Sequence, residues 1–224
     1  MNKSKRVVLF DLDGTILDTY GAISESMDYA TQAVLGKRFS EDYLLSRVGQ
    51  SLLDQMDLFT DDPDKQQEIM RVYRAHNEQN LNEKIQPFPG TRMLLSQLKE
   101  SGCTVGLVTS KREAIAFESL AHFELDCFFD CKVGMESSSK HKPDPEPLLV
   151  ASKKIGCSPD ECVYVGDSPY DMQAAFAAGM LGFAVDWGKF FSHDTLANEP
   201  AFALVSSHDE LLQALSKAIP MISA

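Results

Sequence analysis

The stretch at residues 6–19, RVVLFDLDGTILDT, joins four apolar residues directly to two aspartates and a glycine. The β-branched and aromatic residues at 7–10 predict a buried strand. In an extended chain, residues two apart point to the same side, so Asp11 and Asp13 would bring two carboxylates into one small volume at the strand tip. Such a pair is costly without a cation. The motif therefore predicts a cation site at the end of a buried strand.

Similar short apolar runs recur along the chain and alternate with helical patterns. Capping signals precede the predicted helices at 91–101 and 146–155, and a capping box spans Ser158 to Glu161 with Pro159 between them. This alternation predicts an α/β fold with a doubly wound parallel sheet covered by helices. The predicted strands lie at 7–10, 104–108, 162–165, 182–185 and 201–205.

The segment from about residue 19 to 85 breaks this rhythm, because it has helical periodicity and no convincing strand. Gly36, Gly49 and the TDDPD stretch at 60–64 divide it into about four helices. We therefore expect a core domain from 1–18 and 86–224 and an inserted α-helical cap domain from 19–85. Two apolar stripes support the helices: Ile23, Met27, Ala30 and Val34, then Ile69, Val72, Tyr73 and His76.

Charge and composition exclude several classes of partner. The chain has 21 Lys and Arg against 33 Asp and Glu, and its net charge of −12 argues against nucleic acids and anionic membranes. No apolar run has the length of a signal-peptide core or a membrane span, so we expect a soluble cytoplasmic protein, monomeric or homodimeric. The five cysteines form no C-x-x-C pair, which argues against a disulfide framework or a zinc site.

Polar residues that could bind a ligand or take part in a reaction follow the predicted strands. Ligands of open parallel sheets bind at the carboxyl ends of the strands, so these residues should meet in one crevice. They are Asp11 and Asp13 after the first run, Thr109, Ser110 and Lys111 after the second, Lys142 before the helix at 146–155, and Asp167 and Asp171 after the third.

These residue types suit phosphoryl transfer with magnesium. Asp11 and Asp167 offer hard oxygen ligands and the backbone carbonyl of Asp13 offers a third, which suits octahedral Mg²⁺. Without the cation, a phosphate charge 4 Å from a carboxylate would cost roughly 4 kcal/mol at an effective dielectric of about 20. The lysine and the hydroxyls would neutralise the phosphate oxygens.

Each motif alone has an ordinary structural explanation. DLDG is a good turn sequence, and Thr109 with Ser110 is a plausible helix cap. Lys142 alone reads as a surface lysine, and Asp167 and Asp171 read as a helix cap and a first-turn acid. The joint placement of all four motifs at strand ends favours function.

The four motifs DLDGT (11–15), VTS (108–110), HKPDPEP (141–147) and GDSPYDM (166–172) resemble those of the haloacid dehalogenase-like hydrolases, in order and in spacing, over nearly the whole chain. The resemblance implies that Asp11 is a nucleophile that forms an aspartyl-phosphate and that Asp13 is the general acid and base.

The resemblance also implies that Thr109, Ser110 and Lys142 hold the phosphate. Asp11, Asp13 and Asp167 would bind magnesium, and Asp171 would lie just behind the metal ligands. The cap and the PFPG turn resemble those of the phosphoglycolate phosphatase and pyrophosphatase group. Arg47 and Gln50, with Ser51, are candidate substrate contacts, although Arg47 would also fit a solvated helix position.

The sequence thus predicts a magnesium-dependent phosphatase acting on a small phosphorylated metabolite such as a phosphoglycolate-like monoester or pyrophosphate. A phosphomutase acting on a sugar phosphate is the nearer rival, because the aspartate at position 13 suits both reactions. A phospho-receiver is a more distant one. Receivers also gather acids, a hydroxyl and a lysine around magnesium, but they are about half this length and have no cap.

Overall fold

The computed structural model describes residues 6–222, apart from the side chains of residues 80–83 and 219–222. Its centre is a six-stranded, all-parallel sheet in the order β5-β4-β1-β6-β7-β8. The bounds are β1 (Val7–Phe10), β4 (Thr104–Val108), β5 (Cys131–Val133), β6 (Cys162–Gly166), β7 (Leu181–Val185) and β8 (Ala203–Val205).

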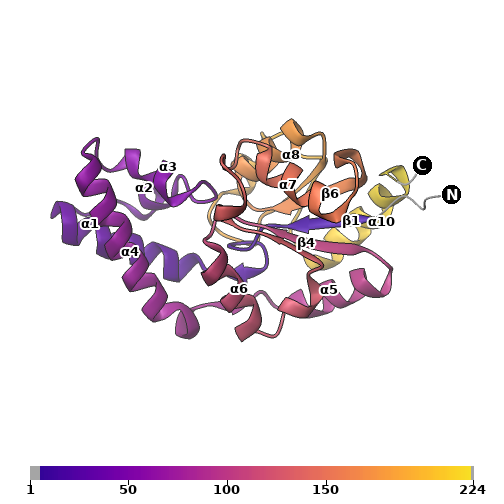
Figure 1. The fold of residues 1–224 in the computed structure, drawn as a ribbon, viewed down its shortest axis with the longest axis horizontal. Helices are drawn as coiled ribbons and strands as arrows, with labels where there is room; N and C mark the ends of the chain where they lie inside the picture. Colours follow the sequence, from indigo (N-terminus) through magenta and orange to yellow (C-terminus); the bar gives the residue numbers. More distant parts are fainter. Residues whose placement is uncertain (1–5, 223–224) are drawn as a thin grey trace.

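Helices cover both faces of this sheet, as Figure 1 shows. One face carries α5 (Thr91–Glu100), α6 (Glu113–His122) and α10 (His208–Ile222), and the other carries α7 (Glu146–Ile155) and α8 (Pro169–Ala178). A short helix, α9 (His193–Ala197), precedes β8. Each face buries its own apolar cluster, so β1 is buried along its whole length. The predicted doubly wound parallel sheet is confirmed.

The strand order shows which edge of the sheet can hold a ligand site. The chain runs outward from β1 through β4 to β5, and then returns to β6 on the other side of β1. The direction of winding therefore reverses at β1, and the carboxyl end of β1 opens into the crevice where ligands of such sheets bind. In register, Phe10 of β1 lies between Leu107 of β4 and Val165 of β6.

Sequence reasoning missed one strand of the sheet. The strand β5 has only three residues, and the charged, half-buried Lys132 interrupts its apolar character. The last strand is shorter than expected, since β8 begins at Ala203 and not at 201. The capping box at Ser158 and Glu161 is present, but it starts a single 3₁₀ turn (Pro159–Glu161) that leads directly into β6. Further 3₁₀ turns lie at Asp126–Phe128 and Met135–Ser137.

The segment between the first two strands of the sheet is helical. It holds α1 (Tyr20–Leu35), α2 (Glu41–Leu45), α3 (Leu52–Gln55), a 3₁₀ turn (Met56–Leu58) and α4 (Pro63–Lys84), and we call residues 20–84 the cap segment. The expected breaks coincide with its boundaries: Gly36 ends α1, Gly49 separates α2 from α3, and Asp62 caps α4. The helices α1 and α4 pack along each other around their own apolar cluster.

A two-residue antiparallel pair joins the cap segment to the sheet. In this pair, β2 (Leu17–Asp18) lies beside β3 (Gln86–Pro87), so the chain leaves and re-enters the α/β part at neighbouring points. In Figure 1 the cap helices stand beyond one end of the sheet, next to α6.

Two expectations from composition can be compared with the fold. Within residues 6–222, no helix combines the length and the apolar character needed to cross a bilayer. The five cysteines all lie within the described residues and form no disulfide with one another.

Candidate active site

Asp11 lies at the carboxyl end of β1, in the centre of the crevice. Its backbone N–H donates to the carbonyl of Val165 (2.9 Å), which fixes it beside β6, and its side chain is almost fully buried. Thr109 follows β4 and its N–H donates to the carbonyl of Val133, so it is fixed in the same way beside β5. The strand register therefore gathers the first two motifs at one edge of the sheet.

Asp13 lies at the mouth of the crevice and is paired with a lysine. Lys111 Nζ lies 2.8 Å from Asp13 Oδ1, and both side chains are largely shielded from solvent. Thr109 Oγ1 accepts a hydrogen bond from the Lys111 N–H (3.2 Å), so the loop after β4 is folded back on itself. Ser110 Oγ donates to the carbonyl of Gly49 (2.7 Å) and thus ties this loop to the cap segment.

Lys142 is the centre of a buried polar network. Its Nζ lies 2.8 Å from Asp11 Oδ1, 2.6 Å from Asp171 Oδ1 and 3.0 Å from the Tyr164 hydroxyl. Only 1% of its surface is exposed, so an ammonium at this depth needs both carboxylates. Asp171 Oδ2 also accepts from Ser168 in a capping box at the start of α8. Asp171 therefore positions Lys142, and Lys142 orients the Asp11 carboxylate.

Asp167 has the features of a cation ligand. Its Oδ2 is buried and has no hydrogen-bond partner among the described residues, and oxygens of Asp11, Asp167 and Asp171 lie within 4.8 Å of one another. Because both oxygens of Asp171 already accept hydrogen bonds, Asp11 and Asp167 are the carboxylates left to bind a metal. Unpaired buried carboxylate oxygens suit Mg²⁺, so the residues present fit the implied cofactor.

Gly14 makes room for this arrangement. Its φ of +81° is a conformation that residues other than glycine rarely adopt, and its N–H donates to the Leu17 carbonyl in the turn after β1. A Cβ at this position would lie 2.0 Å from Asp167 Oδ2. The glycine of the DLDG motif is therefore required both by the turn and by the close approach of Asp167.

The electrostatics follow from burial. Burial raises the pKa of Asp11 to about 7, although the Lys142 ammonium opposes the shift, and the neighbouring Asp171 adds to it. Burial also raises the pKa of Asp167 well above its usual range, and the charges of Asp171 and Asp11 add to that rise. Burial alone would lower the pKa of Lys142, but Asp11 and Asp171 outweigh it and raise that pKa. The buried carboxyl groups of the site thus outnumber its buried cation.

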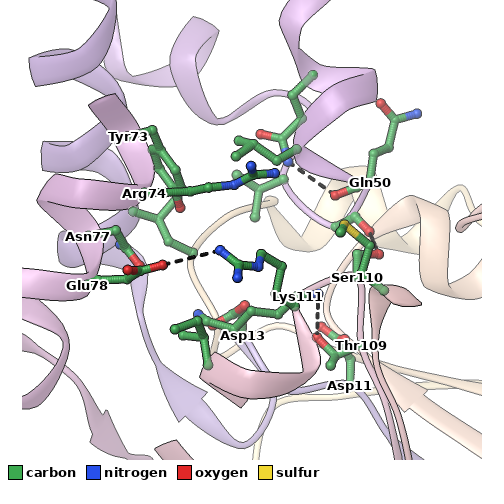
Figure 2. A pocket seen from close by; sticks show the side chains of 18 residues that line it. Asp11, Asp13, Gln50, Tyr73, Arg74, Asn77, Glu78, Thr109, Ser110 and Lys111 are labelled. Carbon is green, nitrogen blue, oxygen red and sulfur yellow. Dashed lines mark hydrogen bonds and ion pairs between the residues drawn. The ribbon is translucent and has the colours of Figure 1, made fainter. Parts of the chain in front are cut away.

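A cavity of about 100 Å³ opens above these residues, between the sheet edge and the cap segment. Figure 2 shows Asp11, Asp13, Thr109 and Lys111 on one side of it and residues of α4 on the other. The α4 residues are Tyr73, Arg74, Asn77 and Glu78, which share one face of the helix because they recur at helical spacing. Both parts of the chain therefore contribute to the same pocket.

Of the three cap residues expected to contact the substrate, Gln50 lines the cavity, and Arg47 and Ser51 do not. Arg47 does not line the cavity, because its Nη1 donates to the carbonyl of Asp54 in α3. Gln50 lines the cavity, but Figure 2 shows its side-chain amide directed away from the other labelled side chains, and its backbone carbonyl accepts from Gln55. Ser51 caps α3 and bonds Asp54. The charged cap side chains that line the pocket, Arg74 and Glu78, come from α4, whereas Ile23, Val48 and Leu52 add apolar lining from elsewhere in the cap segment.

Sequence reasoning left three residues of the site without a role. Tyr164 is part of an apolar strand pattern, and its hydroxyl gave no local sign that it would contact Lys142 and Asp171. Lys111 stood next to the VTS motif and was expected at the crevice, but not as the partner of Asp13. Arg74 belongs to a long polar helix, and only the packing of α4 over the sheet edge brings it to the pocket.

The helix caps next to the site are formed by residues other than the candidate site residues. Ser168, and not Asp167, is the N-cap of α8. Arg112, and not Thr109 or Ser110, occupies the N-cap position of α6. A capping role therefore does not account for Asp167, Thr109 or Ser110.

Known proteins match this chain in sequence and in architecture. A family model described as haloacid dehalogenase-like hydrolase matches residues 8–185. A protein of Caldanaerobacter subterraneus subsp. tengcongensis with the provisional name pyrophosphatase PpaX is 38% identical over 180 residues, which cover 80% of this chain and 81% of that one. Pyrophosphatase PpaX of Bacillus velezensis is 30% identical over 94% of this chain and 96% of its own.

Solved structures agree with the sequence comparison. The crystal structure of "a predicted phosphatase from Clostridium acetobutylicum" superposes with a TM-score of 0.86 at 26% identity, and the match covers 95% of this chain and 99% of that one. The agreement extends over the sheet and the cap segment together, because so little of either chain is left out.

Proposed function

Because this chain belongs to the haloacid dehalogenase-like hydrolase family and its relatives include phosphatases, we propose that it is a magnesium-dependent phosphatase that works through an aspartyl-phosphate on Asp11. The observation that carries the proposal is the pairing of two buried carboxylates. Asp11 is held by Lys142 at 2.8 Å, and the neighbouring Asp167 keeps a buried oxygen without a partner among the described residues.

The first step is nucleophilic attack. An Asp11 oxygen forms a bond to phosphorus while the bond from phosphorus to the leaving oxygen breaks. Lys142 orients the Asp11 carboxylate, and Thr109 and Ser110, which line the same cavity as Asp11, would bind the phosphoryl oxygens. Asp11, Asp167 and the Asp13 carbonyl would hold Mg²⁺, which supplies positive charge against the repulsion between phosphate and carboxylates.

Asp13 moves the proton in both steps. Its carboxyl group donates a proton to the leaving oxygen in the first step and takes a proton from water in the second. That water attacks the phosphorus of the aspartyl-phosphate and releases phosphate and the free Asp11 carboxylate. The support for this role is position: Asp13 lies two residues after the nucleophile at the mouth of the crevice, next to the solvent side, with Lys111 at 2.8 Å.

The cavity and the relatives support a small substrate. A cavity of about 100 Å³ is well below the volume of sites for drug-sized ligands, which begins at about 300 Å³. The names of the Caldanaerobacter and Bacillus relatives make pyrophosphate the first candidate, and a phosphoglycolate-like monoester is the second. The proposal includes a cytoplasmic location and a monomeric or homodimeric enzyme.

A phosphate-release assay tests the proposal. Pyrophosphate, phosphoglycolate, p-nitrophenyl phosphate and several sugar phosphates are each incubated with the enzyme and Mg²⁺, with a chelator, or with Ca²⁺. We expect release with Mg²⁺ from at least one small substrate and none with the chelator. Ca²⁺ should not replace Mg²⁺, because its larger and looser coordination shell misplaces the reacting oxygen. Full activity in excess chelator, or no release from any compound, would contradict the proposal.

A further inference from the structure

Arg74 is the cationic residue that the cap segment presents to the pocket. It lies on α4, is half-buried and lines the cavity above Asp11 and Asp13. Figure 2 shows its side chain extending from α4 into the space between the cap and the sheet edge. The preceding residue, Tyr73, is close enough to the acid that Asp13 adds to the rise in pKa that burial gives its hydroxyl. This part of α4 therefore lies directly over the reacting groups.

The other basic residues at the site are already paired. Lys142 contacts Asp11 and Asp171, and Lys111 contacts Asp13. Arg112, at the rim, forms longer ion pairs with Glu78 (3.5 Å) and Glu136 (3.8 Å). Among the described residues, Arg74 has neither an ion pair nor a hydrogen bond from its guanidinium. It is thus the basic group of the pocket that remains available to a ligand.

The sequence of α4 explains why Arg74 stays unpaired among the described residues. Glu78 is four residues further along and shares its helix face, but an Arg that precedes a Glu at this spacing is the weaker orientation for an ion pair. Glu78 instead turns to Arg112 of the α/β part. The remaining cap side chains of the pocket are apolar, amide or phenolic, including Val48, Asn77 and Tyr73. None of these can neutralise a guanidinium.

A half-buried guanidinium without a partner is suited to an oxyanion. Its planar fork of N–H groups matches a carboxylate or a phosphate, with two parallel hydrogen bonds. The net charge of −12 makes this local cation more important, because the protein as a whole repels anions. The phosphoryl group to be transferred is expected beside Asp11, Thr109 and Lys142, so Arg74 faces the leaving group from the opposite side of the cavity.

We propose that Arg74 determines specificity by binding a second anionic group on the leaving side of the substrate. The substrate class is then a small phosphoester or phosphoanhydride that carries a further carboxylate or phosphate. This inference rests on the proposed phosphatase function and makes it more specific. It distinguishes such compounds from simple alkyl or aryl phosphates, which offer Arg74 no charge.

The kinetic test compares two classes of substrate in one variant. Pyrophosphate and phosphoglycolate carry the second anion, whereas ethyl phosphate and p-nitrophenyl phosphate do not. We expect Arg74→Gln to lower kcat/KM for the first pair by about 10- to 100-fold, since a charge-assisted hydrogen bond is lost. The values for the second pair should stay within about threefold of wild type. The ratio between pyrophosphate and phosphoglycolate identifies which anion is preferred.

Two further variants serve as controls. Arg71→Gln removes an arginine one turn earlier on α4, where it is exposed and paired with Glu68, and it should leave every substrate unaffected. Arg74→Lys keeps the charge without the fork and should restore part of the lost kcat/KM. An equal loss for all four substrates in Arg74→Gln would mean that the residue only supports the fold of the cap, and would overturn the inference.

A binding measurement separates this inference from the proposed reaction. Calorimetry with imidodiphosphate, a non-hydrolysable diphosphate, should show binding about 10-fold or more weaker in Arg74→Gln, while orthophosphate binds equally well to both proteins. If wild type hydrolyses none of the four substrates but this difference persists, the proposed reaction fails and the anion site stands. If imidodiphosphate binds equally well to both proteins, the Arg74 inference fails, whatever the activity.

Discussion

Replacing Gly14 tests two effects that can be measured separately: strain in a left-handed backbone and displacement of a residue of the site. In Gly14→Ala, the added Cβ would meet Asp167 Oδ2 in a backbone with φ of +81°, whereas in Gly36→Ala the φ of +65° is similar and the surroundings are open. Both variants should lose about 1–2 kcal/mol of stability from the left-handed backbone. Only Gly14→Ala should also lower the affinity for Mg²⁺, by about 10- to 100-fold, because the added Cβ would displace Asp167, the proposed metal ligand. Chemical denaturation and a Mg²⁺ titration of activity measure the two effects. Equal Mg²⁺ titrations would contradict the placement of Asp167.

Asp11 gives a second test at the scale of one residue. Asp11→Asn should abolish turnover and leave the fold intact, because an amide neither attacks phosphorus nor binds magnesium well. Asp209→Asn, at an exposed position in the first turn of α10, is the matched control and should have wild-type activity. Circular dichroism and phosphate release measure fold and turnover. Activity of Asp11→Asn within tenfold of wild type would remove the nucleophile from this position.

The raised pKa values predict a pH-dependent stability of the metal-free protein. Asp11 has a pKa of about 7 in the folded state against an ordinary value of 3.8, so the folded protein keeps a proton that the unfolded chain loses. Stability should therefore fall as pH rises from about 4 to about 7, by up to about 1.4 kcal/mol per pH unit for one such group. Thermal unfolding in chelator from pH 5 to 8, for wild type and Asp11→Asn, measures this contribution as their difference.

Magnesium should reverse that trend. It binds the deprotonated carboxylates, so the rise in Tm that Mg²⁺ causes should be larger at pH 8 than at pH 5. A rise in Tm that is independent of pH would mean that Asp11 and Asp167 are not the groups that meet the cation.

Single residues of the site differ in how far the sequence predicts them. Asp11, Thr109 and Asp167 follow apolar strands, so the rule that parallel strands end at one edge is enough to bring them together. Tyr164 and Arg74 carry no such local signal. Tyr164 reads as one more buried strand residue, and Arg74 reaches the pocket only through the packing of α4 against the rest of the molecule.

At the scale of elements, the cap segment has the properties of an insertion. Its helices surround their own apolar cluster, which includes Met27, Met56 and Ile69. The strands β2 and β3 hold its two ends side by side, with Asp18 opposite Gln86. A variant without residues 20–84 needs only a short Gly/Ser linker, and we expect it to remain folded.

That deletion would expose the apolar ring of Phe190 to solvent, because its partner Tyr20 is removed; the two ring centroids lie 5.3 Å apart. A second version with Phe190→Ser removes the exposed ring. Circular dichroism and size-exclusion chromatography of both versions measure folding and association. If both aggregate, the cap segment is a necessary part of one core and not a separable domain.

Element boundaries were predictable where capping signals and long apolar runs coincide. The helix at 146–155 begins and ends where the sequence predicts. The strand β5 was missed because three residues with a lysine in the middle make no recognisable pattern, and its place in the sheet comes only from pairing with β4. Short edge elements of this kind depend on tertiary contacts more than on local sequence.

At the scale of the whole molecule, the proposed reaction needs both parts of the chain. In the proposed reaction, the α/β part would supply the nucleophile, the acid and base, and the metal ligands. The cap segment contacts the sheet edge through the hydrogen bond from Ser110 to Gly49, and Arg74 in the pocket lining would meet the leaving group. Closure of this kind excludes water from the first step and still has to admit one water for the second.

Asp13→Asn separates these two steps. Its backbone carbonyl remains, so metal affinity should be kept, while the loss of acid and base catalysis should slow turnover by about 10² to 10⁴. The loss in the first step should be smaller for p-nitrophenyl phosphate, whose leaving group departs without a proton. The second step still needs an activated water, so the phosphorylated enzyme should accumulate with this substrate.

Rapid acid quench of Asp13→Asn with p-nitrophenyl phosphate, followed by mass spectrometry of its peptides, tests the central claim most directly. The account predicts a phosphoryl group on the peptide that contains Asp11 within the first turnover, and none in the double variant that also carries Asp11→Asn. Hydrolysis of p-nitrophenyl phosphate without any phosphorylated peptide, or a phosphoryl group on another residue, would contradict the account.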